Sequence, residues 1–192
     1  MKKLFIAVVL VLFSVLPLGS AKVVTDPIDV TIDRDNVWTY RSYESVMQNR
    51  KKQLTCLAKN IYFEARNEPF VGQFAVALVT LNRVHDTDFP NTVCEVVYEG
   101  IHTASGFPKR DRCQFSWYCD GKHDEPSKGK MWKESKDVAT YALTNTKMLD
   151  ITDGATHYHA DYIPEPRWAT RRDRTMQIDT HIFYNKHKNY TF

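Results

Sequence analysis

The chain has 192 residues, with 26 basic and 23 acidic side chains and a net charge of +3 at pH 7. This near balance leaves no strong basic stripe, which argues against a nucleic-acid-binding protein. The length suits one domain with a sizeable hydrophobic core.

The first 21 residues have the three parts of a secretory signal. Lys2 and Lys3 precede an apolar run over residues 4–18, and the small residues Gly19, Ser20 and Ala21 follow at the positions that a signal peptidase requires. The run is shorter than the roughly 20 residues of a membrane span. We therefore expect cleavage after Ala21, export to the periplasm or the cell exterior, and no stable membrane span. An uncleaved anchor is the alternative.

Residues 22–42 are polar and are expected to form a lead-in segment before a folded domain over residues 43–192. Apolar side chains then recur at spacings of three and four, which predicts an amphipathic helix. Its inner face comprises Leu54, Leu57, Ala58, Ile61 and Ala65. Asn67 and Pro69 are expected to end this helix, because proline cannot continue its hydrogen bonds.

Pro69 suits the first turn of a second helix, and residues 70–81 are apolar nearly all round, which predicts a central buried helix. Residues 92–95 read Thr-Val-Cys-Glu, a capping box that predicts a short helix through Tyr98. Residues 100–130 hold many turn-forming residues and are expected to form a long pinned loop. Another helix is expected over residues 132–148. Its inner face comprises Val138, Ala139, Ala142 and Leu143.

The last part of the sequence changes character. Residues 156–159 are typical of a strand, and residues 176–184 are typical of a hairpin that turns at Asp179 and Thr180. Helices followed by a small terminal sheet predict a mainly helical α+β fold, with a helical lobe and a small antiparallel β lobe.

Four cysteines follow the signal segment, and an even number in an exported chain predicts two disulfides. They are Cys56, Cys94, Cys113 and Cys119. Three pairings are possible, of which we favour a local Cys113–Cys119 clasp with a longer Cys56–Cys94 bridge. A zinc site is the weaker interpretation, because the chain contains no Cys-x-x-Cys pair.

Glu64 has the most suggestive position of any carboxylate. On a helical wheel it lies roughly 60° from the centre of the apolar face, and it is near the helix C-terminus, where the backbone dipole disfavours an anion. Both features raise a carboxyl pKa, as a general acid for glycosidic cleavage requires. The alternative is a structural glutamate at the rim, paired with Arg66 or Arg83.

An ordered series of motifs over about residues 54–185 resembles the cell-wall hydrolase family typified by the spore-cortex-lytic enzyme SleB. The longest runs over residues 56–69 and includes Glu64-Ala65-Arg66-Asn67-Glu68. The others lie at residues 72–73, 75–77, 81–84, 89–93, 96–98, 113–117, 154–158, 168, 178 and 181–184.

The resemblance implies a lysozyme-like, lytic-transglycosylase-like catalytic domain over residues 43–192. It also implies cleavage between N-acetylmuramic acid and N-acetylglucosamine, with Glu64 as the catalytic glutamate of the family's Glu-Ala-Arg-Gly-Glu motif. The chain departs from the family at Phe63, where glycine is frequent, and at Asn67, which replaces the glycine after arginine. Asparagine tolerates the left-handed conformation of a helix end, whereas Phe63 changes the shape beside the acid.

Further residues are candidates for binding the substrate. Trp117, Tyr158 and Trp168 are candidates for stacking on sugar rings, while Phe115 is expected in the core. Gln114 and Ser116 are candidates for hydrogen bonds to N-acetyl or hydroxyl groups, or for holding the cysteine loop. His181 is also a candidate for binding the substrate. Glu68 is expected first as a helix-terminal or arginine-pairing group and second as a binding or catalytic partner of Glu64.

The expected activity is therefore cleavage of peptidoglycan glycan strands by a monomeric lytic transglycosylase that needs no metal or cofactor. Its one glutamate protonates the leaving group and then deprotonates the muramic 6-hydroxyl. The alternatives are a muramidase-type hydrolase that uses the same glutamate, and a non-catalytic peptidoglycan-binding module. A third is a zinc-dependent amidase built from His157, His159, His181 and His187.

Overall fold

A computed structural model describes residues 40–145 and 149–186. The expected signal segment over residues 1–21, residues 22–39 of the lead-in segment, and His187 lie outside this part of the chain. The chain divides into two compact units, Met1–Tyr43 and Glu44–Phe192, and of the first only the beginning of helix α1 is described. In the described ranges, no helix is both long and apolar enough to cross a membrane.

The second unit combines helices with two small antiparallel sheets. The helices are α1 (Tyr40–Ala65), α2 (Phe70–His85), α3 (Val93–Val97) and α4 (Lys130–Thr144), with 3₁₀ turns η1 (Ser116–Cys119) and η2 (Ala169–Arg171). The strands are β1 (Gly100–His102), β2 (Pro108–Cys113), β3 (His157–Ala160), β4 (Asp173–Ile178) and β5 (His181–Asn185). The predicted mainly helical α+β class is confirmed.

Helix α1 has the amphipathic character that its spacing predicts. Leu57, Ala58 and Ile61 are buried, as is Ala65 at its last position. The amide of Glu68 then donates to the Ala65 carbonyl at 2.9 Å, which closes the turn before Pro69. The predicted end of this helix is therefore confirmed.

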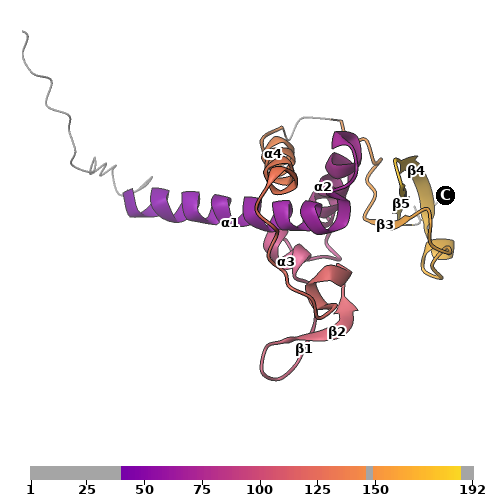
Figure 1. Cartoon of the computed structure of the whole chain (residues 1–192), viewed down its shortest axis with the longest axis horizontal. Coiled ribbons are helices and arrows are strands. Elements are labelled where there is room, and N and C mark those ends of the chain that lie inside the picture. Colours follow the sequence, from indigo (N-terminus) through magenta and orange to yellow (C-terminus); the bar gives the residue numbers. More distant parts are fainter. Residues whose placement is uncertain (1–39, 146–148, 187–192) are drawn as a thin grey trace, which may run out of the picture. The chain divides into compact units, whose positions relative to one another are not determined.

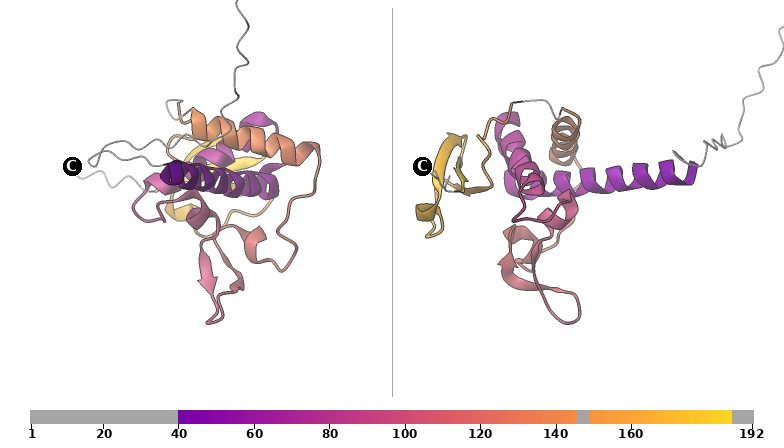
Figure 2. Two further views of the ribbon diagram at one scale, coloured as in Figure 1. Left: turned by 90° about the vertical axis from the view of Figure 1, so that its left-hand side faces the viewer. Right: turned by 180° about the vertical axis from the view of Figure 1, so that it is seen from behind.

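Helix α2 is the centre of the unit. It contacts α3, α4 and β4, and Figures 1 and 2 show it between α4 and the three-stranded sheet. Ala75, Val76, Ala77 and Val79 are fully buried, as expected for a central helix. Pro69 is the N-cap residue, one position before the first turn predicted for it.

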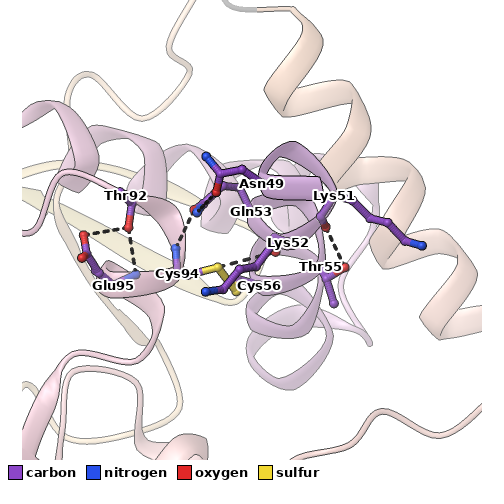
Figure 3. Close-up of a disulfide and its surroundings, with 9 residues drawn as sticks. All are labelled: Asn49, Lys51, Lys52, Gln53, Thr55, Cys56, Thr92, Cys94 and Glu95. Atoms are coloured by element: carbon purple, nitrogen blue, oxygen red, sulfur yellow. Dashed lines mark hydrogen bonds between the residues drawn. A yellow bond between two sulfur atoms is a disulfide. The ribbon is translucent and has the colours of Figure 1, made fainter. Parts of the chain in front are cut away.

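The capping box and the favoured long disulfide are both confirmed (Figure 3). Thr92 accepts a hydrogen bond from the Glu95 amide at 3.3 Å and donates to the Glu95 carboxylate at 2.7 Å. Cys94, inside this short helix, is bonded to Cys56 of α1. The two helices are therefore joined covalently in the core.

The prediction of a long loop over residues 100–130 is partly wrong. Strands β1 and β2 pair there as an antiparallel hairpin, which extends away from the helices in Figures 1 and 2. Strand β2 has no alternating apolar pattern, because its central residues are charged. Lys109, Arg110 and Arg112 are all exposed, so hydrophobic periodicity could not predict this strand. Cys113 at the end of β2 is bonded to Cys119 of η1, as favoured.

The last helix and the terminal sheet follow the predictions more closely. Helix α4 begins two residues before the expected position 132, and Thr144 is its last residue. The terminal sheet has the order β3-β5-β4, and its β4–β5 hairpin turns at Asp179 and Thr180 as predicted. Phe183 of β5 packs with Ala75 and Val79 of α2 in a small second core. The sheet is thus fixed against the central helix.

Candidate active site

A cavity of about 1100 Å³ opens between the C-terminal end of α1, the segment from η1 to residue 127, and the terminal sheet. Six of the residues proposed from the sequence line it. They are Glu64, Ser116, Trp117, Tyr158, Trp168 and His181. Residues separated by more than 100 positions in the chain therefore meet at one site.

Glu64 lies in the last turn of α1 and is half-buried. The hydroxyl of Tyr158, on strand β3, donates a hydrogen bond of 3.0 Å to its Oε2 atom. Within residues 40–145 and 149–186, no ion pair joins Glu64 to Arg66 or Arg83. Neither arginine is therefore within ion-pair distance of Glu64, and Arg83 acts on it only as a nearby charge.

Burial raises the pKa of Glu64 above the ordinary carboxyl value of 4.5. The hydrogen bond from Tyr158 and the positive charge of Arg83 both lower this pKa, but their effects are smaller than that of burial. The carboxyl group thus holds its proton at a higher pH than a solvated glutamate does. A general acid that works near neutral pH needs this property.

Tyr158 remains a hydrogen-bond donor because burial and the adjacent Glu64 carboxylate raise its pKa well above 10. Its ring lies edge-on to His181, with centroids 5.1 Å apart, and contacts Phe183 at 5.7 Å. These neighbours belong to β5, which pairs with β3. The sheet therefore determines the direction from which Tyr158 approaches the acid.

Arg83 supplies the positive charge next to this pair. It is only 4% exposed, and its guanidinium lies against the rings of Phe115 (4.9 Å) and Phe89 (5.2 Å). Its Nε donates to the Thr156 carbonyl at 2.7 Å, one residue before β3. Phe115 is buried, as expected, and helps to hold this cation in place.

The opposite wall is aromatic. Trp117 stacks on Phe63 with ring centroids 4.6 Å apart, so the side chain at the position where the family often has glycine fills space next to Glu64. The Trp117 indole donates to Asn60 Oδ1 at 3.0 Å, and the Asn60 amide donates to Thr80 at 3.1 Å. Asn60 was missed in the sequence analysis. It was detectable as a polar residue between Leu57 and Ile61, four positions before Glu64.

The segment after η1 forms a charged side of the cavity that was also missed. Glu125 pairs with Lys59 of α1 at 2.6 Å, and the Ser127 amide donates to the Tyr62 hydroxyl at 3.3 Å. Asp120 lies 3.4 Å from Lys122. Each of these two cavity carboxylates therefore has a lysine partner, unlike Glu64.

The structure places two proposed binding residues outside this cavity. Glu68 follows the end of α1, so its carboxylate turns away and accepts hydrogen bonds from the Thr180 hydroxyl (2.7 Å) and amide (3.4 Å). The backbone N–H of Gln114 donates a hydrogen bond of 3.0 Å to the Glu99 carbonyl. The residue lines a separate pocket of about 360 Å³. Both residues hold structural elements together.

The histidines proposed for zinc are engaged in different ways. His159 contacts the Tyr184 hydroxyl at 3.0 Å, and burial with nearby Arg83 and Arg172 lowers the pKa of His157 to about 3. Across the described ranges, no three His, Cys, Asp or Glu residues are grouped to hold a metal ion.

The mainly helical α+β fold places a protonatable glutamate at the end of a helix, facing an open cavity, as a domain that cleaves glycosidic bonds requires. The model of the family described as Cell Wall Hydrolase matches residues 67–184. The chain belongs to this family. The matched segment begins three residues after Glu64, so the proposal for Glu64 depends on the geometry.

Curated relatives agree with this membership. A spore cortex-lytic enzyme of Bacillus subtilis (strain 168) is 51% identical over 128 residues, which are 66% of this chain and 35% of that protein. One from Oceanobacillus iheyensis is 31% identical over 134 residues, 69% of this chain and 41% of that protein. The chain thus spans well under half of the length of these relatives.

Two solved structures have the same fold. The catalytic domain of the Bacillus cereus SleB protein gives a TM-score of 0.53 at 28% identity, covering 70% of this chain and 91% of that chain. The catalytic domain of the germination-specific lytic transglycosylase SleB from Bacillus anthracis gives 0.54 at 29% identity, covering 70% and 95%.

Proposed function

We propose that this protein cleaves peptidoglycan glycan strands between N-acetylmuramic acid and N-acetylglucosamine, as a lytic transglycosylase with Glu64 as its one catalytic acid and base. The observation that carries the proposal is the Glu64 carboxyl group itself. It faces the large cavity, has a raised pKa and accepts a hydrogen bond from Tyr158 without an ion-pair partner among the described residues. Membership of the cell wall hydrolase family supports the substrate class.

The reaction needs no second carboxylate. Protonated Glu64 gives its proton to the glycosidic oxygen as the bond from that oxygen to C1 of the muramic residue breaks. The resulting carboxylate takes the proton of the 6-hydroxyl on the same residue, and O6 bonds to C1 to form a 1,6-anhydro ring. No water is consumed, and Glu64 is protonated again at the end.

Tyr158 and Arg83 have complementary parts in this cycle. Once Glu64 has lost its proton, the Tyr158 hydroxyl donates to the carboxylate and the nearby Arg83 charge stabilises it. Burial favours the protonated form before the transfer. These opposing effects keep both protonation states accessible, as an acid that later acts as a base requires.

The similarity to the germination-specific lytic transglycosylase SleB from Bacillus anthracis favours this route over hydrolysis. A hydrolase needs a second carboxylate as nucleophile or as the base that activates water. Asp120 and Glu125 line the cavity, but each interacts with a lysine. A muramidase-type hydrolase that uses Glu64 is the second candidate, because water can take the place of the 6-hydroxyl.

We propose export to the periplasm or the cell exterior, which the two disulfides and the membership of the cell wall hydrolase family support.

Mass spectrometry of the fragments released from purified sacculi tests the proposed route. We expect 1,6-anhydro-muramic ends. Reducing muramic ends, heavier by one water, would instead show hydrolysis. Release of free peptides without glycan cleavage, lost with EDTA and restored by zinc, would show an amidase.

A further inference from the structure

A second cavity, of about 530 Å³, is lined by the turn that follows α1, by the start of α2 and by α4. Its walls include Phe70 and Gln73 from the start of α2, and Glu134 and Tyr141 from α4. Arg66 lines both cavities and marks their common border. The two cavities are therefore neighbours on either side of this arginine.

Arg66 has unused binding capacity at this border. One guanidinium nitrogen donates to the Tyr62 carbonyl at 3.2 Å, and the group lies 5.0 Å from the centre of the Tyr62 ring. No acidic side chain in the described part of the chain forms an ion pair with it. Its remaining N–H groups are suited to a carboxylate, which a guanidinium binds through two parallel hydrogen bonds.

Gln73 forms part of the wall of the second cavity. It is only 5% exposed, and its Nε2 donates to the Glu68 carbonyl at 3.0 Å. This hydrogen bond joins the start of α2 to the turn that carries Arg66 and Glu68, so the cavity wall is fixed on this side.

The walls of this cavity combine exposed rings with negative charge. Phe70 is 50% exposed and Tyr141 is 37% exposed, and their rings meet at 5.5 Å. Glu134 and Asp137 add carboxylates, which pair only with exposed lysines one turn away on α4. Such surface pairs are weak, so these carboxylates can also attract an amine.

We propose that the second cavity binds the stem peptide carried by the muramic residues of the substrate, with Arg66 holding a peptide carboxylate at the border. This inference rests on the proposed glycan cleavage. A stem peptide branches from a muramic residue beside the cleaved bond, so its site must adjoin the catalytic cavity. It carries carboxylates and commonly a side-chain amine, which match Arg66 and the α4 carboxylates respectively.

The test compares glycan strands that bear stem peptides with the same strands after enzymatic removal of the peptides. The measured quantity is the ratio of kcat/KM for the two substrates. We expect a ratio of about ten or more for the wild type, falling toward one in Arg66→Gln and Phe70→Ser, with partial recovery in Arg66→Lys. Phe107→Ser is the matched control, because Phe107 is 70% exposed on the β1–β2 hairpin and lines neither cavity.

Two results of this comparison would overturn the inference. One is a wild-type ratio near one. The other is an equal loss on both substrates in Arg66→Gln and Phe70→Ser, which would assign the cavity to a further sugar of the strand. Either variant alone suffices if the other fails to fold.

Direct binding separates this inference from the proposed function. Calorimetry with Glu64→Gln protein and a free stem tetrapeptide should show binding that weakens at least fivefold when Phe70→Ser is added. If the wild type cleaves neither substrate but the peptide still binds in this way, the proposed function fails and the peptide site stands. Absence of peptide binding would contradict the site.

Discussion

The Tyr158 hydroxyl donates a hydrogen bond of 3.0 Å to Oε2 of Glu64, across 94 residues of sequence. It joins the last turn of α1 to β3 of the terminal sheet. Phe183 of β5 packs on α2, which fixes the terminal sheet against the helices. Helix α1, which carries Glu64, and strand β3, which carries Tyr158, are therefore held in one framework. The chemistry of Glu64 therefore depends on tertiary structure as well as on its helix.

We expect Tyr158→Phe to slow glycan cleavage by about tenfold, since a hydrogen bond of roughly 1 to 1.5 kcal/mol to the carboxylate is lost. The same change should move the alkaline limb of the pH–activity profile upward, because this hydrogen bond lowers the pKa of Glu64. The ring contacts with His181 and Phe183 are retained. Measuring kcat against pH checks both effects.

Tyr118→Phe is the control for this change. Tyr118 bonds to His102 at 3.3 Å and does not line the catalytic cavity, so its removal should leave the pH profile unchanged. A wild-type profile in Tyr158→Phe would contradict the part assigned to this hydrogen bond.

The raised pKa of Glu64 also affects stability. Between the ordinary value of 4.5 and its higher folded value, the folded protein binds more protons at Glu64 than the unfolded chain does. The wild type therefore loses stability from this group as pH rises through that window. Glu64→Gln removes the ionisable group, so its melting temperature relative to wild type should increase from pH 4 to pH 8. A difference that does not change with pH would contradict this account.

The two disulfides should contribute unequally to stability. Cys56–Cys94 closes a separation of 38 residues, whereas Cys113–Cys119 closes one of 6. Loop entropy then predicts that Cys56→Ala with Cys94→Ala costs about 1.5 kcal/mol more than the same change at the shorter bridge. Urea unfolding of the two double variants measures this difference. Equal losses would show that chain entropy does not dominate.

Trp168 tests the aromatic contribution to substrate binding. It lines the catalytic cavity, and its ring contacts His157 and Tyr184 at 5.5 Å. With stacking worth about 1 kcal/mol, Trp168→Ala should raise KM several-fold and change kcat less. Trp132→Ala is the control for this change in KM, because Trp132 does not line this cavity. A loss confined to kcat would place Trp168 in the chemistry.

The spacing of apolar residues and the helix-ending residues predicted the elements that support the site. The spacing of Leu57, Ala58 and Ile61 predicted α1, and Asn67 with Pro69 predicted its end. The pairs Cys56–Cys94 and Cys113–Cys119 were favoured from spacing and are present. The helix, its end and the Cys113–Cys119 clasp depend on neighbours in the chain, which is why the sequence reveals them.

The features that escaped prediction depend on partners distant in the chain. The Glu68 carboxylate, proposed to bind substrate, instead accepts a hydrogen bond from Thr180, more than 100 residues later. The pairing of Glu125 with Lys59 likewise brings a loop onto α1 without any periodic signal. Charged β2 formed a strand because its backbone pairs with β1.

The clearing of purified sacculi by Glu64→Gln protein is the most direct test of the catalytic assignment. The substitution keeps the size of the side chain and removes the acidic carboxyl proton, so we expect activity to fall by about 10² to 10⁴-fold, the usual contribution of a general acid. Binding to sacculi and the circular dichroism spectrum should match the wild type. Undiminished clearing by the folded variant would contradict the central claim that Glu64 is the catalytic acid.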